Sequence, residues 1–94
     1  MATLFVRHKV SDYGNWKRAY DDFASVRKEK GVTGASVHRD ANDQDFVIVT
    51  HQFADVNAAT TFANSEELKS TMAKAGVAGP PELWFAEDIE QTAY

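Results

Sequence analysis

An α+β fold that repeats a β-α-β unit within one domain is predicted by three features of the 94-residue sequence. Residues 3–40 and residues 45–91 each place an amphipathic helical pattern between two apolar, alternating runs. The length allows one domain with one core. A composition of 44% hydrophobic and 26% charged residues is ordinary for a globular domain. We therefore expect residues 1–94 to form a single domain.

The first repeat begins with a strand predicted over residues 3–10. Its alternation puts one mostly apolar set on a single face: Leu4, Val6, His8 and Val10. Ser11 or Asp12 is the expected N-cap of one continuous helix that runs as far as Gly31. Large side chains recur along this helix at helical spacing: Tyr13, Trp16, Tyr20, Phe23 and Val26. A second strand is predicted over residues 33–40.

The second repeat begins after a polar turn at residues 41–44, which joins the strands on either side into a hairpin. The strand predicted over residues 45–53 contains a β-branched run. Asp55 is expected to cap a short helix. Asn64 with Glu67 resembles a capping box and is expected to open the last helix.

Glycine and proline set the end of the chain's last β-α-β unit. Gly76 is expected to end the last helix in a left-handed conformation. Pro80 and Pro81 then lead into a final strand over residues 82–91. The order βαββαβ predicts a ferredoxin-like arrangement, in which a four-stranded antiparallel sheet has the strand order 4-1-3-2 and helices on one face.

The third and fourth predicted strands are apolar on both faces, which indicates that a second copy covers one face of the sheet. In the third strand two apolar sets alternate, Phe46 and Ile48 against Val47, Val49 and Phe53. In the fourth the two sets are Trp84 and Ala86 against Leu83 and Phe85. A sheet that is covered by helices on one side only would carry polar residues on the other. We therefore expect a homodimer packed sheet against sheet, which makes a dimeric α+β barrel.

Charge and composition exclude several classes of partner and chemistry. A formal net charge of -4 without a basic run gives no footprint for nucleic acid. The absence of cysteine excludes disulfides and thiolate chemistry. Arg7 and Lys9 lie where a signal peptide needs its apolar centre, and no run approaches transmembrane length. We expect a cytoplasmic protein with no membrane partner.

Two stretches resemble a known family: VRHKVSDYGNWKRAYDDF, where a strand runs into an aromatic helix, and FANSEELKSTMAKAGVAGPPELWFAEDIE, which leads into the last strand. Together with the element order and the two-faced strands, they make the chain similar to the dimeric α+β barrel superfamily, near its antibiotic biosynthesis monooxygenase-like group. The resemblance covers nearly the whole chain. It is compatible with cofactor-free monooxygenases, haem-degrading enzymes, polyketide cyclases and uncharacterised members.

The chain lacks residues that some members of the superfamily use, which reduces the number of activities that the resemblance implies. Haem-degrading relatives use a Trp in the second helix and a His in the helix after it, but the matching positions hold Phe62 and Met72. A haem site is therefore not expected, and neither is any other cofactor. Quinone-forming relatives use Asn, Trp, Arg and Tyr around the pocket. This chain supplies some of those types, without the pattern, at Arg7, Trp16, Tyr20 and Trp84.

The three histidines are not expected to form a metal site. His8 and His51 should lie near opposite ends of adjacent antiparallel strands, about 15 Å apart at about 3.3 Å per residue. His38 shares the end of His8, but the third strand lies between them, which sets them about 9–10 Å apart. His8 and His51 each have two interpretations. Each is either a satisfied core histidine or the polar group of a pocket, able to exchange a proton near neutral pH.

The functional hypothesis is a pocket between sheet and helices that holds a small apolar or aromatic molecule. The expected lining is His8, Trp16, Tyr20, His51, Phe62, Met72 and Trp84. The direction of Trp84, toward the helices or toward a second copy, stays open. For an enzyme, the resemblance implies a cofactor-independent monooxygenase of an electron-rich aromatic, with His8 or Tyr20 handling a proton. Two alternatives remain: a non-enzymatic binding or structural dimer, and a polyketide or aromatic cyclase.

Overall fold

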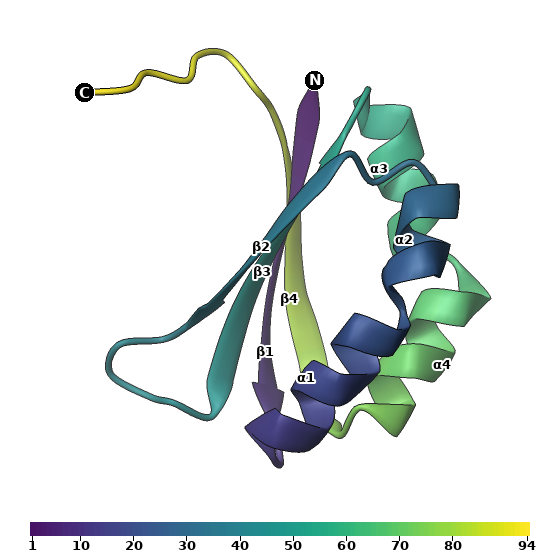
Figure 1. The fold of residues 1–94 in the computed structure, drawn as a ribbon, viewed down its shortest axis with the longest axis vertical. Helices are drawn as coiled ribbons and strands as arrows, with labels where there is room; N and C mark the ends of the chain where they lie inside the picture. Colours follow the sequence, from purple (N-terminus) through teal and green to yellow (C-terminus); the bar gives the residue numbers. More distant parts are fainter.

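A four-stranded antiparallel sheet with helices on one face forms the molecule (Figure 1). The computed structural model describes all of residues 1–94. The strands are β1 (Ala2–Val10), β2 (Gly34–Arg39), β3 (Phe46–Phe53) and β4 (Val77–Glu87). They lie in the order β2-β3-β1-β4, which confirms the predicted ferredoxin-like topology. The helices pack on one side, and the other face of the sheet is uncovered.

The helices are α1 (Tyr13–Asp22), α2 (Ala24–Glu29), α3 (Val56–Ala63) and α4 (Glu66–Lys74). None of them has the length and apolar character needed to cross a bilayer. The single helix expected as far as Gly31 is instead two, because the backbone at Phe23 leaves helical geometry with φ -86° and ψ 0°. Arg27 donates a hydrogen bond to the carbonyl oxygen of Tyr20 just before the break. The break is therefore stabilised by a side chain from the second helix.

Polar side chains cap the helices of both repeats. Asp12 accepts from the Asn15 backbone N–H at 3.2 Å, and Asp55 accepts from that of Ala58 at 2.8 Å, as predicted. The predicted N-cap of α4 differs from the observed one by one residue. Ser65, and not Asn64, is the N-cap, because its Oγ accepts from the Leu68 N–H at 3.3 Å.

Gly76 joins the end of α4 to β4 and has the predicted left-handed conformation. This glycine has a φ of 79°, in the left-handed region that other residues rarely adopt. A Cβ at this position would also lie 2.6 Å from the Ser11 Oγ. Any larger residue would therefore strain the backbone and displace the turn that leads into α1.

The final strand starts and ends earlier than the predicted residues 82–91. β4 already begins at Val77 and stops at Glu87. Glu87 pairs with Ala2, the first residue of β1, and the Asp88 N–H beyond it still donates to the Met1 carbonyl oxygen at 2.9 Å, after which the pairing with β1 ends. Ile89, expected in the strand, is 90% exposed in the segment that follows. Strand length is here set by the neighbouring strand and not by the alternation of β4 itself.

A bulge interrupts β4 opposite His8. The pairing of β4 with β1 shifts register between Arg7 and Lys9. The flanking pairs are Arg7 with Glu82 and Lys9 with Ala78, so residues 79–81 stand opposite His8 alone. Two of those three residues are prolines, which lack the N–H needed in a regular ladder and occur at bulges.

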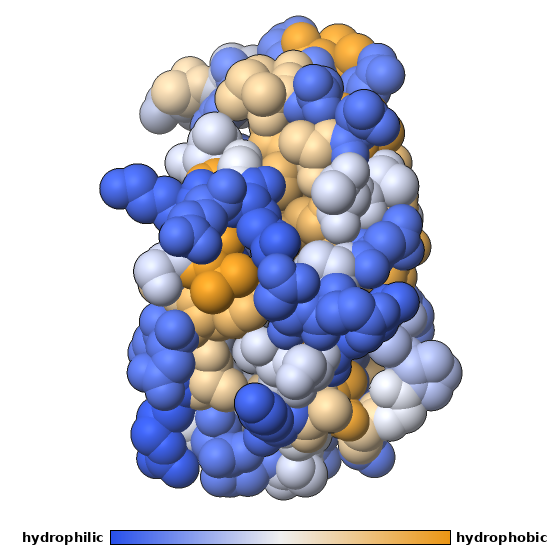
Figure 2. All heavy atoms as spheres, turned by 90° about the vertical axis from the view of Figure 1, so that its right-hand side faces the viewer, coloured by the Kyte–Doolittle hydropathy of each residue, from blue (hydrophilic) through white to orange (hydrophobic).

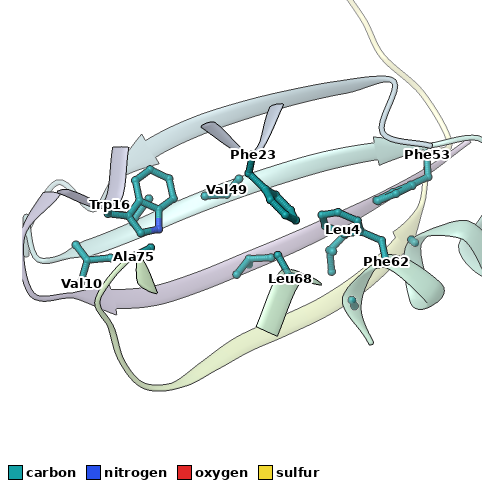
Figure 3. Close-up of a cluster of buried hydrophobic side chains, with 13 residues drawn as sticks. Leu4, Val10, Trp16, Phe23, Val49, Phe53, Phe62, Leu68 and Ala75 are labelled. Carbon is teal, nitrogen blue, oxygen red and sulfur yellow. The ribbon is translucent and has the colours of Figure 1, made fainter. Parts of the chain in front are cut away.

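The hydrophobic core lies between the sheet and the helices. The pairing of Val6 with Val49 puts the inward sets of β1 and β3 side by side. Phe53 and Phe62 are the largest fully buried side chains, with ring centroids 5.5 Å apart. Figure 3 shows them together with Leu4 and Phe23 over the inner face of these two strands. The contacts in this core attach the helices to the inner face of the sheet.

Candidate functional site

A small cavity of about 50 Å³ lies between the sheet and the helices. Its floor comes from β1 and β3 and its walls from α1, α2 and α4. The lining consists of Val6, His8, Trp16, Tyr20, Phe23, Arg27, Val49, His51, Leu68, Thr71, Met72 and Ala75. Most of these residues are apolar. Figure 2 views the molecule from its helical side, where hydrophilic residues cover much of the surface and hydrophobic residues show between them.

His8 and His51 are the polar groups of the cavity floor. Both are buried, with 5% of each residue exposed. Both nitrogens of His8 and the Nδ1 of His51 are buried without a hydrogen-bond partner. Burial lowers the pKa of His8 to about 4, and burial together with the smaller effects of Arg27 and His8 lowers the pKa of His51 to about 4. Both rings are therefore neutral at pH 7, and each can accept a hydrogen bond from a molecule in the cavity.

The two imidazoles stand at different ends of the floor. His51 pairs with Leu4, whereas His8 lies four residues farther along β1 and pairs with Val47. His8 and His51 therefore point to the same side of the sheet without touching. The expected separation along adjacent strands agrees with this register. No group of three or more His, Asp or Glu side chains is placed to hold a metal ion.

One wall of the cavity is a stack of aromatic rings on α1. The ring of Trp16 lies edge-on to His8 at 5.7 Å and stacks on Tyr20 at 5.1 Å between centroids. Trp16 is buried and Tyr20 is half-buried at the rim. A flat aromatic molecule in the cavity would therefore meet rigid aromatic faces, which favour offset or edge-on stacking.

Arg27 closes the cavity on the side of α2. Its guanidinium lies 3.7 Å from the centroid of the Tyr20 ring and donates to the Tyr20 carbonyl oxygen. Arg27 and His51 line the same cavity, and the positive charge of Arg27 contributes to the lowered pKa of His51. A cation thus stands at the edge of an otherwise apolar lining.

The structure brings five of the predicted pocket residues together and leaves two outside. The five that line the cavity are His8, Trp16, Tyr20, His51 and Met72. Phe62 instead lies behind His51, with ring centroids 5.2 Å apart, and fills the core. Trp84 lies on the opposite face of the sheet, because it pairs with the outward-facing Phe5 and stacks on it at 5.9 Å.

Sequence reasoning missed Phe23 and Arg27 as parts of the cavity wall. The signal was present, because Trp16, Tyr20, Phe23 and Arg27 follow one another at spacings of four, three and four residues. Such spacing keeps side chains on one helical face. Hydrophobicity alone selects Val26 as the next member of the stripe, because Val26 is apolar and Arg27 is charged. The break at Phe23 and the stack on Tyr20 instead turn Arg27 toward the cavity.

The chain is therefore a small ferredoxin-like α+β protein with a cavity between its sheet and its helices. The family described as antibiotic biosynthesis monooxygenase matches residues 14–74. The match covers most of the chain, from α1 through α4, and includes much of the cavity wall. The chain belongs to this family.

Solved structures share the fold at low sequence identity. An antibiotic-biosynthesis-monooxygenase-type protein of Bordetella bronchiseptica has a TM-score of 0.81 at 12% identity, over 95% of this chain and 97% of that one. One from Caulobacter crescentus has a TM-score of 0.75 at 17% identity, over 95% and 90%. SnoaB, a cofactor-independent oxygenase from Streptomyces nogalater, has a TM-score of 0.77 at 10% identity, over 96% and 94%. No curated protein sequence matches the chain.

Proposed function

We propose that this protein binds a small aromatic molecule between sheet and helices and oxidises it as a cofactor-independent monooxygenase. The observation that carries the proposal is the pair of buried, neutral imidazoles in an apolar cavity, with nitrogens that no protein group satisfies. Buried polar groups without partners are costly and rare. A ligand hydroxyl would supply the missing partner. Family membership and the shared fold of an oxygenase support the choice of chemistry.

The size of the cavity favours a ligand with one ring. At about 50 Å³ it is roughly a third of an engineered cavity of ~150 Å³ that admits benzene. Even one ring therefore requires part of the wall to move. Met72 is half-buried on α4, and its flexible thioether can change rotamer at low cost. The ring then fits between Trp16 and the floor.

The chemistry that the site supports is oxidation of a phenol by O₂. His8 accepts the hydrogen bond of the phenol hydroxyl. The lowered pKa of His8 makes its imidazole a weak base. The proton moves to His8 only because the negative phenolate that forms beside the ring stabilises the imidazolium. The electron-rich phenolate then reacts with O₂ at a ring carbon. One oxygen atom becomes the second carbonyl of a quinone, and the other leaves as water with the hydroxyl hydrogen and one ring hydrogen.

Oxygen consumption with phenols and hydroquinones tests this proposal. The wild-type protein should consume O₂ and release a quinone. In His8→Ala that rate should fall by about a hundredfold or more, since about a hundredfold is the lower end of what a positioned acid–base group contributes. His38→Ala is the matched control, because His38 is exposed on the other face of the sheet. Equal rates for the wild-type protein and His8→Ala would reject His8 as the proton acceptor.

A second function, binding without turnover, is favoured by the same low pKa. A histidine that is hard to protonate serves better as a hydrogen-bond acceptor than as a base. Under this alternative the same phenols bind and raise the melting temperature, because ligand bound only to the native state stabilises it. No oxygen would be consumed. Binding together with oxygen consumption would reject it.

We also propose that two copies pack through the uncovered face of the sheet. Phe5, Ile48 and Trp84 point outward from that face. Trp84 is 45% exposed even though it stacks on Phe5. An aromatic residue so exposed on an uncovered sheet face is typical of an interface. A second copy offers the same surface, and a two-fold axis would bring the two faces together.

A further inference from the structure

Arg27 is a half-buried cation without an anionic partner. The five ion pairs of the structure use Arg7 twice and otherwise Lys17, Lys30 and Lys69. No acidic side chain lies within ion-pair distance of the Arg27 guanidinium. A charge that is partly removed from water usually has a counter-charge, since desolvation is costly. The missing counter-charge therefore calls for an explanation.

The guanidinium is held in place and still has donors to spare. It stacks on the Tyr20 ring at 3.7 Å and donates one hydrogen bond to the Tyr20 carbonyl oxygen. An arginine has five N–H donors, so four remain without a protein acceptor. Stacking fixes the plane of the guanidinium. Its N–H donors can then bind both oxygens of a carboxylate, with little further loss of side-chain entropy.

Arg27 stands where two concave surfaces meet. It lines the aromatic cavity, and it also lines an open groove of about 590 Å³ along the end of α2 and the start of β2. The remaining groove residues are Ala24, Lys28, Gly31, Val32, Thr33, Gly34 and Ala35. Neither lining contains an acidic residue. A molecule whose ring enters the cavity would therefore present its outer end to Arg27, with Lys28 beyond it.

We propose that the ligand of the cavity is an aromatic carboxylate, with its ring against Trp16 and Tyr20 and its carboxylate on Arg27. The proposal rests on the cavity being a ligand site and adds the charge of the ligand. The carboxylate of the ligand would provide the negative partner that Arg27 lacks within the protein. A hydroxyl on the far side of the ring would reach the imidazole of His8, which lies at the other end of the floor from His51.

A structural role for Arg27 predicts a different result from a ligand-binding role. If Arg27 served only to support the helix break at Phe23, its replacement would lower stability and weaken all ligands alike. If it binds a carboxylate, its replacement weakens anionic ligands selectively. The ratio of two affinities separates the roles, because a general loss of folding cancels in the ratio.

The experiment compares 4-hydroxybenzoate with the neutral 4-hydroxybenzamide by isothermal titration calorimetry at pH 7. The wild-type protein should bind the carboxylate roughly tenfold more tightly or better, as one charge-assisted hydrogen bond predicts. Arg27→Met should remove this preference and leave the amide almost unchanged. Arg27→Lys should keep part of it, since the charge remains but the fork does not. Arg39→Met is the control, because Arg39 stacks on Tyr13 at 4.4 Å outside the cavity lining.

Three results would overturn the proposal. Equal affinities of the wild-type protein for the two compounds would reject the carboxylate and leave the aromatic site standing. A preference that survives in Arg27→Met would place the anion elsewhere. Failure of both compounds to bind would reject the aromatic site itself, and with it the function proposed above.

Discussion

The free energy of unfolding should fall as the pH drops from about 6.5 toward 4, because His8 and His51 are buried in their neutral form. An unfolded histidine takes up a proton near its ordinary pKa of about 6.5, whereas burial lowers the folded pKa of each ring to about 4. Between these values the unfolded state binds the extra protons, so stability decreases as the pH falls. Each histidine contributes up to about 1.4 kcal/mol per pH unit.

Urea denaturation at pH 6.5 and pH 5.0 measures this loss. His8→Leu and His51→Leu should each reduce the difference in unfolding free energy between the two pH values, and the exposed His38→Leu should not. The window stops at pH 5.0 because the lowered pKa values of Asp40 and Glu67 confine their loss of stabilisation to more acidic solutions. The account of the two histidines fails if neither substitution changes the pH dependence.

Single residues also show how far the site could be predicted. His8, Trp16 and Tyr20 were found because apolar faces of period two and about 3.6 identify inward positions. Trp84 could not be placed, since a strand that is apolar on both faces gives no preferred direction. Arg27 was missed because its inward direction depends on a helix break and a cation–π contact, neither of which hydrophobic periodicity encodes.

At the scale of elements, the type and order of the strands and helices were predictable and several of their boundaries were not. The strand order follows from two split β-α-β units of one handedness. The boundaries depended on partners. β4 stops at Glu87, which pairs with Ala2, the first residue of β1. The helix predicted as far as Gly31 breaks at Phe23, where the Tyr20 carbonyl oxygen accepts from both the Phe23 N–H and the Arg27 guanidinium.

At the scale of the whole molecule, the uncovered sheet face should mediate dimerisation, and Trp84→Glu should convert the dimer to a monomer. A carboxylate in the proposed interface, beside the apolar ring of Phe5, would be buried without a partner. The cavity lies on the other face of the sheet, so the variant should keep its affinity for phenols. Sedimentation velocity at micromolar concentration measures the change.

The matched control for this variant is Ile89→Glu. Ile89 is 90% exposed in the segment after β4, so a charge there leaves the sheet face intact. That variant should remain dimeric. A wild-type monomer under these conditions, or a dimer of undiminished stability in Trp84→Glu, would refute the proposed interface.

The two tryptophans lie on opposite faces of the sheet, and this arrangement allows the most direct test of the aromatic site. The measurement is a ¹H–¹⁵N NMR titration that follows the two indole N–H signals as phenol is added. A molecule in the cavity stacks against Trp16, so the Trp16 signal should shift in a saturable way while the Trp84 signal stays in place. A Trp16 signal that does not move, or equal movement of both signals, would contradict the proposal that the cavity is a binding site.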